Sequence, residues 1–187
     1  MIRIPVNTAS SSYETVIEHG VLARAGDILA KLIGQSCPLF IVTVAPVRRR
    51  WGKVLLQSLT AAGFSPKILE MRDGERFKRL STVERLAEDL IKLGADRKAV
   101  VLALGGGVVG DVAGMLASIY MRGVKLIQVP TTVQAQLDAA IGGKTGVNLR
   151  SGKNLLGTFF QPQLVLIDPQ RSPLSLSASS APECTKP

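Results

Sequence analysis

Residues 99–121 constrain the fold more than any other part of this sequence. This stretch contains a single charged residue, Asp111, and five glycines, three of which stand together at positions 105–107. Its length would suit a membrane span, but the glycines would divide such a helix into two short pieces. We therefore predict a buried strand over 99–104, a turn at the glycines, and a buried helix that reaches about Met121.

Strand-like and helix-like segments alternate along the chain before and after this stretch. The pattern predicts strands over residues 2–7, 13–18, 38–44, 66–71 and 124–129. It predicts helices over 21–33 and 47–62, a helix that begins at the capping-box pattern of residues 81–84 and runs to Leu93 and Gly94, and a short helix from Thr131 or Thr132. This alternation predicts an α/β, Rossmann-like fold with a mainly parallel sheet and helices on both faces.

The composition indicates one domain with a real core. The chain has 187 residues, of which 46% are hydrophobic. Its two cysteines, Cys37 and Cys184, fit no metal-binding spacing, and no segment has the pattern of a signal peptide, so we expect a cytoplasmic location. Residues 171–187 hold five serines and three prolines without an apolar period. We therefore expect a domain over 1–168 and a disordered tail over 169–187.

The formal net charge of +9 calls for an explanation. Nucleic acid is the generic partner of such a chain, and the densest basic clusters are 48–50 and 72–79. However, few aromatic residues stand among these cations and no nucleic-acid-binding module is recognisable. Phosphorylated small molecules also attract cations, and a solvated basic surface is the simplest interpretation. We expect neither a nucleic acid nor a membrane as partner.

The glycine turn has the spacing of a phosphate-binding loop. Gly105, Gly107 and Gly110 match G-x-G-x-x-G between a predicted strand and a predicted helix. Without side chains, the backbone can approach a pyrophosphate, and the amides at the helix start point toward it. Close packing of strand and helix alone would also favour glycines. The lysine of a P-loop is missing, which disfavours a nucleoside triphosphatase.

A standard dinucleotide domain would carry an acid about 20 residues further on, to bind the ribose hydroxyls. The predicted strand 124–129 offers Lys125 and Gln128 there but no acid. The nearest candidates, Asp73 and Glu75, lie upstream. We therefore predict a variant in which the ribose is held from the end of the preceding strand.

A second polar cluster follows Pro130. It begins with Thr131 and Thr132, continues with Asp138, and includes two lysines beside glycines, Lys144 and Lys153. Cations on constrained backbone indicate binding of anionic groups. The alternative is two hairpin turns with solvated lysines. We expect His19 at the surface, and we predict no metal ligands in this chain, because one histidine without a cysteine cluster cannot form a usual zinc site.

Taken together, these motifs resemble the 3-dehydroquinate synthases. The matching pieces stand in family order and are densest from residue 73 onward: Asp73-Gly74-Glu75-Arg76-Phe77-Lys78, the glycine turn 105–111, Tyr120-Met121-Arg122-Gly123, Gln128-Val129-Pro130-Thr131-Thr132, Ala135-Gln136-Leu137-Asp138, residues 142–148, Gly152-Lys153-Asn154 and residues 159–162. No single piece is decisive, but the ordered set is specific.

The resemblance implies binding of NAD and a phosphorylated heptulosonate, whose conversion to 3-dehydroquinate with loss of phosphate belongs to the shikimate pathway. It also implies a homodimer. By motif, the catalytic positions would be Asp138, Lys144 and Asn154. The cofactor-binding positions would be Asp73, Glu75, Lys78, Gly106, Gly107, Val108, Gly110, Asp111, Thr131, Thr132, Lys144 and Lys153. Open alternatives are another sugar phosphate cyclase, a metal-dependent polyol dehydrogenase, and a non-catalytic nucleotide-binding module.

Two departures from the family pattern matter. Where the family often has an acidic or amide residue after its second nucleotide-fold strand, this chain has Val44-Ala45. The family also continues into a helical domain that binds zinc or cobalt, and its glutamate and two histidine ligands have no matching positions here. We therefore expect the helical metal-binding domain to be absent and this chain to be a truncated, inactive form.

The last residues offer a reason for this expectation. Permissible codons for residues 171–187, read from the third base of codon 171, can encode Leu-Ser-Thr-Leu-Pro-Glu-Arg-Glu-Phe-Arg-Ala-Gly-Met-Tyr-Glu-Ala, which resembles the family's continuation. We expect a single lost base near codon 171, and resequencing the DNA tests this.

Overall fold

Strongly apolar runs form the central strands of a mainly parallel sheet. The computed structural model describes residues 1–8 and 11–169. Its seven-stranded sheet has the order β1-β2-β9-β6-β5-β3-β4, and only β1 runs antiparallel to its neighbour. The bounds are β1 (Ile2–Asn7), β2 (Ser12–Ile17), β3 (Leu39–Val44), β4 (Lys67–Met71), β5 (Val100–Gly105), β6 (Lys125–Pro130) and β9 (Leu164–Ile167). β3, β5 and β9 are buried along their whole length, as expected for parallel strands covered on both faces.

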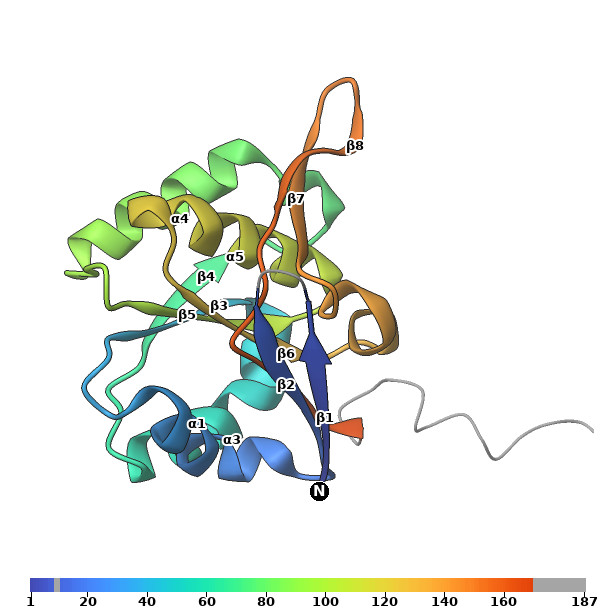
Figure 1. The fold of residues 1–187 in the computed structure, drawn as a ribbon. Coiled ribbons are helices and arrows are strands. Elements are labelled where there is room, and N and C mark those ends of the chain that lie inside the picture. Colours follow the sequence, from blue (N-terminus) through green and yellow to red (C-terminus); the bar gives the residue numbers. More distant parts are fainter. Residues whose placement is uncertain (9–10, 170–187) are drawn as a thin grey trace, which may run out of the picture.

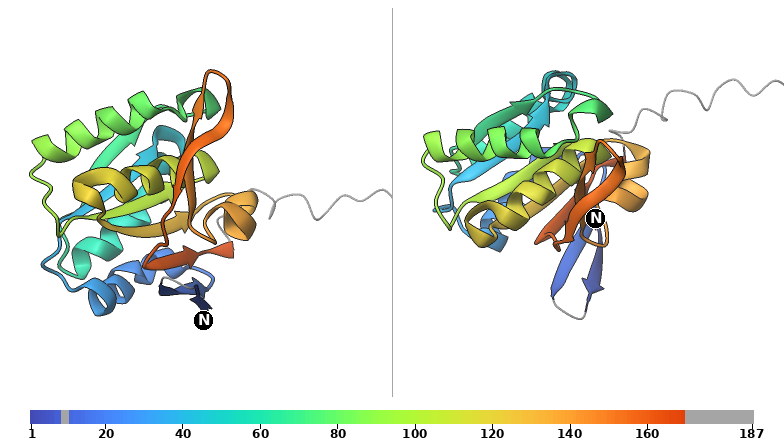
Figure 2. Two further views of the ribbon diagram at one scale, coloured as in Figure 1. Left: turned by 45° about the horizontal axis from the view of Figure 1, so that its top comes forward. Right: turned by 90° about the horizontal axis from the view of Figure 1, so that it is seen from above.

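Helices cover both faces of this sheet, as the sequence predicted (Figures 1 and 2). One face carries η1 (Val21–Arg24), α1 (Ala25–Ile33), α2 (Ala45–Val47), η2 (Arg48–Gly52) and α3 (Lys53–Ala61). The other carries α4 (Leu80–Lys92), α5 (Gly107–Ile119) and η4 (Tyr120–Arg122). η3 (Glu75–Phe77) is a short 3₁₀ helix, and η5 (Ala135–Ala139) is a short π-helix that follows Thr131 and Thr132. Successive residues of β5 belong to opposite cores, with Val101 beside α4 and α5 and Leu102 beside α1 and α3.

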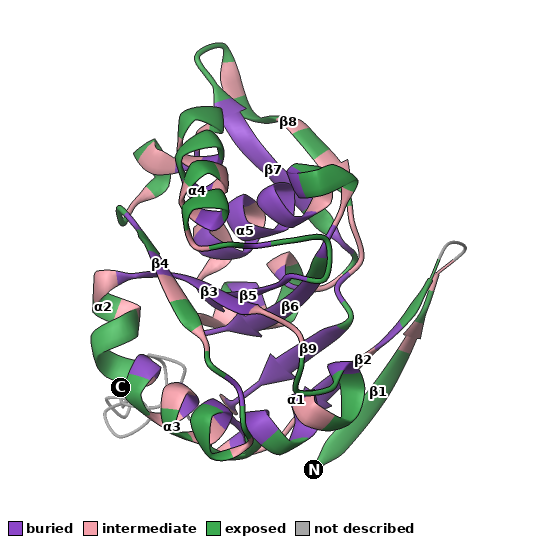
Figure 3. Ribbon diagram, turned by 90° about the vertical axis from the view of Figure 1, so that its left-hand side faces the viewer, coloured by how far each residue is buried: buried purple, intermediate pink, exposed green. Residues whose placement is uncertain are grey.

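The burial pattern explains the stretch that resembled a membrane span (Figure 3). Residues 99–121 form β5, the glycine turn and α5, and eight residues of α5 are buried. Among the described residues, no helix is long and apolar enough to cross a membrane.

The capping-box prediction was wrong. α4 begins at Leu80, and Arg79, with extended backbone, occupies the N-cap position without a side-chain cap. The hydroxyl of Thr82 instead donates to the carbonyl of Phe77 at 2.7 Å. The helix start is therefore tied to the turn before it.

Residues 144–159 form one hairpin and not two. β7 (Lys144–Leu149) pairs antiparallel with β8 (Gly152–Phe159). Figure 1 shows the hairpin over α5, with its tip extending beyond the body of the domain. A Cβ built on Gly114 of α5 would lie 2.4 Å from Cγ2 of Thr145, so the glycine permits this close packing. The predicted tail falls almost entirely outside the described residues.

Candidate functional site

The glycine turn and the two threonines meet at the carboxyl edge of the sheet. Gly105 ends β5 opposite Pro130 of β6, and the amide of Thr131 donates to the carbonyl of Gly105 at 2.9 Å. A Cβ built on Gly106 would lie 3.1 Å from Cγ2 of Thr132. A side chain at position 106 would therefore press against Thr132.

The start of α5 has features that favour an anion. Gly106 is its N-cap residue and provides no side-chain cap, and the first turn carries no acidic residue. The first amides of a helix lack partners within the helix and carry the positive end of its dipole. Gly107 and Val108 are half-buried, whereas Gly110 is buried and its carbonyl accepts from Gln128 at 3.2 Å. The turn thus fits the pyrophosphate of a dinucleotide.

Lys78 lies at the centre of a partly buried polar network beside this turn. Its side chain is only 6% exposed, and its ammonium donates to the carboxylate of Asp111 on α5 and to the amide oxygen of Asn154 on β8. Asn154 adopts a positive φ of 55°. Three segments distant in sequence therefore converge on one cation.

Asn148, which the sequence analysis did not single out, connects the same segments. Its side-chain nitrogen donates to Glu75 at 2.7 Å, and its side-chain oxygen accepts from the amide of Asn154 at 2.8 Å. Its own amide donates to the carbonyl of Lys78 at 2.9 Å. Asn148 is 6% exposed. The hairpin is thereby fastened to the turn that carries Glu75 and Lys78.

Burial raises the pKa of Asp111 above its ordinary value of 3.8. The hydrogen bond and charge of Lys78 lower it, but not enough to offset desolvation, and the carboxylate of Glu75 raises it further. Desolvation of this carboxyl group therefore outweighs the stabilisation that Lys78 gives to its charged form.

Glu75 and Asn154 are exposed residues, and so are four other predicted site residues. Lys144 and Asp138 form an ion pair of 3.0 Å at the rim, with both side chains more than half exposed. Lys153 and Asp73 are exposed as well, Asp73 at the carboxyl end of β4 and Lys153 on β8. The structure thus brings Lys78, Asp111 and Asn154 into direct contact and links Glu75 to Asn154 through Asn148. Asp138 and Lys144 form a separate exposed pair.

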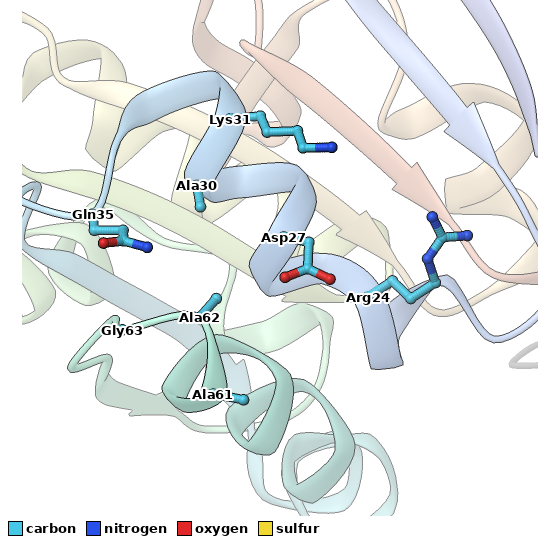
Figure 4. Close-up of a pocket in the computed structure, with 8 residues that line it drawn as sticks. All are labelled: Arg24, Asp27, Ala30, Lys31, Gln35, Ala61, Ala62 and Gly63. Atoms are coloured by element: carbon cyan, nitrogen blue, oxygen red, sulfur yellow. The ribbon is translucent and has the colours of Figure 1, made fainter.

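Of two cavities, one lies away from the carboxyl edge of the sheet and the other lies at it. One of about 620 Å³ lies between α1 and the end of α3, beside Gln35 and Gly63, which precede β3 and β4 (Figure 4). It contains none of the predicted site residues. The other, of about 700 Å³, lies at the carboxyl ends of β3 and β4 and is lined partly by Asp73.

Metal binding does not fit the described residues. Within 1–8 and 11–169, no group of three histidine, cysteine or carboxylate side chains is placed to hold a metal ion. His19 is exposed, as expected.

Comparison with known proteins places this geometry in a family. The family model described as 3-dehydroquinate synthase N-terminal matches residues 68–177. The chain is 52% identical over 169 residues to 3-dehydroquinate synthase of Koribacter versatilis, covering 90% of this chain and 46% of that protein. It is 49% identical over 170 residues to the enzyme of Gloeobacter violaceus, covering 91% and 47%. The chain therefore spans about half the length of the curated relatives it matches.

Solved structures agree with these sequence relatives. A 2-deoxy-scyllo-inosose synthase complexed with carbaglucose-6-phosphate, NAD+ and Co2+ superposes with a TM-score of 0.83 at 30% identity, over 91% of this chain and 47% of that one. The 2-epi-5-epi-valiolone synthase of Streptomyces hygroscopicus subsp. jinggangensis, with NAD+ and Zn2+ bound, gives 0.78 at 34% identity, over 89% and 45%. Since the family model covers more than half of its residues, this chain belongs to the 3-dehydroquinate synthase family and corresponds to its N-terminal part.

Proposed function

We propose that this chain is the NAD-binding half of a 3-dehydroquinate synthase, which converts 3-deoxy-D-arabino-heptulosonate 7-phosphate to 3-dehydroquinate and phosphate. The observation that carries the proposal is the uncapped glycine turn at the start of α5 beside the Lys78–Asp111–Asn154 network. The names of the relatives at 52% and 49% identity support the reaction. We further propose a cytoplasmic homodimer.

Different residues would bind different parts of the cofactor. The amides of Gly106, Gly107 and Val108 would bind the pyrophosphate. The surface around it would be formed by Gly110, Thr131 and Thr132. Asp73, Glu75, Lys78 and Asp111 would hold the ribose hydroxyls, and Lys153 would contact the cofactor from β8. When bound, NAD supplies a hydride acceptor.

The substrate would lie against the hairpin. Lys144 and Asn154 would contact its anionic groups, including the phosphate, because cations and amide donors recognise phosphate oxygens. Asp138, paired with Lys144 at 3.0 Å, would face the nicotinamide and the substrate. Ligand binding at Lys144 would exchange one ion pair for another, which costs little at an exposed site.

The described residues offer no metal site, so no step through a metal is assigned to them. We propose that the 187-residue chain alone has no synthase activity. Turnover of the heptulosonate phosphate by purified chain with NAD and zinc would contradict this.

Another sugar phosphate cyclase is the second candidate function. It is favoured by the two solved structures at 30% and 34% identity, which are cyclases of other products. A non-catalytic nucleotide-binding module is the third. Ligand binding distinguishes this module from a cyclase, since the NAD-binding half of a cyclase should bind a sugar phosphate together with NAD.

Calorimetric titration of NAD into the purified chain tests the proposal. A Cβ on Gly107 would make only an ordinary contact, 3.5 Å from Cβ of Ala139, so the fold should tolerate Gly107→Ala. The added methyl would stand where the pyrophosphate approaches, and NAD affinity should fall at least about tenfold, or 1.4 kcal/mol. Gly52→Ala, where the Cβ would meet only the flexible side chain of Arg48 at 3.2 Å, is the matched control. Absence of saturable NAD binding to the unaltered chain would overturn the proposal.

A further inference from the structure

Two asparagine side chains of the β7–β8 hairpin form a directed chain of hydrogen bonds. Nδ2 of Asn148 donates to Glu75 at 2.7 Å, and its Oδ1 accepts from the backbone amide of Asn154 at 2.8 Å. Oδ1 of Asn154 in turn accepts from the ammonium of Lys78. An ionised carboxylate only accepts, whereas an ammonium or a backbone N–H only donates. Neither side-chain amide can therefore be reversed without losing a partner.

The orientation of Asn154 leaves its own donors for a ligand. Its Oδ1 is turned to Lys78, and no group in the described part of the chain accepts from its Nδ2. Asn154 is exposed, and its backbone has a left-handed φ of 55°. Asparagine tolerates that conformation better than most residues do, and the bond to Asn148 holds the backbone N–H. Asn148 thus fixes the backbone that carries an amide donor suited to phosphate oxygens.

Asn148 cannot reach a ligand itself. It is 6% exposed, and both polar atoms of its side chain have protein partners. Its backbone amide donates to the carbonyl of Lys78 at 2.9 Å, and its own carbonyl accepts from Arg79 at 3.3 Å. Any effect of this side chain on binding must therefore act through Glu75 and Asn154.

We propose, resting on the proposed function, that Asn148 is a positioning residue for both ligands of the site. It orients the carboxylate of Glu75 toward the cofactor ribose and holds the backbone of Asn154, whose amide contacts the substrate phosphate. One buried side chain thus couples the cofactor-binding turn to the substrate-binding hairpin. Loss of its bond to Glu75 weakens cofactor binding and loosens the hairpin at the same time.

Asn148→Asp removes one of the two side-chain bonds and keeps the other. The aspartate retains an oxygen for the N–H of Asn154, but it places a second oxygen against Glu75 where Asn148 has its donor. Two carboxylates in contact repel each other when both are ionised, and they form a hydrogen bond again when they share one proton. The defect of this variant therefore depends on pH, whereas a loss of packing does not. Asn7→Asp is the matched control, since it makes the same change on an exposed residue of β1, at the opposite edge of the sheet from β4.

Calorimetric titration of NAD into the full chain, over about pH 4.5 to about pH 8, measures the defect. At the upper end, Asn148→Asp should bind NAD about tenfold more weakly than the wild type, and at the lower end less than about threefold more weakly. Lys78, Arg79 and Asp111 are the other charged groups around Asn148 and Glu75, and they are present in both chains. The ratio of the two affinities therefore isolates the change at position 148. The control variant should bind NAD like the wild type throughout.

Hydrogen exchange at the backbone amide of Asn154 reports on the hairpin without a ligand. At a fixed pH of about 7, the protection of this amide should fall about tenfold in Asn148→Asp. Glu75→Gln/Asn148→Asp exchanges the donor and the acceptor of the pair and should recover the wild-type protection. Recovery requires the bond between positions 75 and 148, because the double variant differs from Asn148→Asp only in the amide donor at position 75.

The outcomes separate this proposal from the proposed function. If Asn148→Asp binds NAD as tightly as the wild type at the upper pH, or is weakened equally at both ends of the range, the positioning role is overturned and the NAD site stands. If the double variant does not recover the protection of Asn154, the coupling of turn and hairpin is overturned. If the wild type does not bind NAD, the proposed function fails, and recovery by the double variant alone decides whether Asn148 positions Asn154.

Discussion

Lys78 and Asp111 form an ion pair across 33 positions of sequence, and both side chains are largely buried. Lys78 comes from the turn after β4, whereas Asp111 lies in α5, so the pair fixes the turn to the helix whose start is the proposed pyrophosphate site. Neither partner can be removed without leaving the other uncompensated.

Replacing the cation should therefore be costly. We expect Lys78→Met to destabilise the fold by about 3 kcal/mol, because it leaves a buried carboxylate without its counter-ion. Urea unfolding measures this. Lys78→Met/Asp111→Leu removes both charges and should recover most of the loss. A double variant as unstable as the single one would show that packing of the Lys78 stem, and not the charge, carries the stability.

The raised pKa of Asp111 predicts a pH dependence of stability. The folded protein holds this proton to higher pH than the unfolded chain does, since burial raises the pKa above 3.8. The contribution of Asp111 to stability is thus greatest below about 3.8 and is lost as the pH rises through the folded-state value. As the pH rises from about 3.8 to the folded-state pKa, the free energy of unfolding of the wild-type chain should fall relative to that of Asp111→Asn. Above the folded-state pKa, the difference between the two chains should stay constant. Paired urea titrations from about pH 3.5 to about pH 7 measure the difference. If the wild-type chain became more stable relative to Asp111→Asn as the pH rises, the raised pKa of Asp111 would be contradicted.

The packing of the hairpin on α5 depends on Gly114. A Cβ there would lie 2.4 Å from Cγ2 of Thr145, so Gly114→Ala should destabilise the fold by about 2 kcal/mol through overpacking. Thr145→Ser removes that methyl and keeps the hydroxyl that bonds Thr158 at 2.7 Å. The double variant Gly114→Ala/Thr145→Ser should therefore regain part of the loss in thermal unfolding. Strict additivity of the two substitutions would refute a steric cause.

The exposed pair Asp138–Lys144 should contribute little to stability. Both side chains are more than half exposed at 3.0 Å separation, and such pairs are worth less than about 1 kcal/mol. We expect Lys144→Ala to shift the urea midpoint only slightly, in contrast to Lys78→Met. A large destabilisation would mean that Lys144 supports the fold and is not held ready for a ligand.

Local signals in the sequence were sufficient for most elements of the fold. The predicted helices end at Gly34 and Gly63 as the structure has them, because a left-handed terminal residue is a local requirement. Strands such as β3 and β5 follow from continuous apolar runs. The start of α4 was misplaced at the capping box, since the competing bond from Thr82 to Phe77 is set by the preceding turn.

The site was predictable as residue types but not as a network. The glycine turn and Lys78 follow from motifs, whereas the burial of Lys78 depends on Asn154 arriving from a hairpin 76 positions later. Asn148 lies in the matched motif 142–148, but its role had no local signal, because its bonds exist only after β7 folds back over Glu75. Long-range contacts of this kind carry no local pattern.

The position of β9 has a consequence for synthesis of the protein. β9 lies between β2 and β6, so β1 and β2 join the rest of the sheet only through Leu164–Ile167. Chains leave the ribosome from the N-terminus, and the first hairpin is therefore among the earliest parts to emerge and the last to be docked. Until residue 167 is outside the exit tunnel, β2 and β6 lack the strand that pairs with both of them.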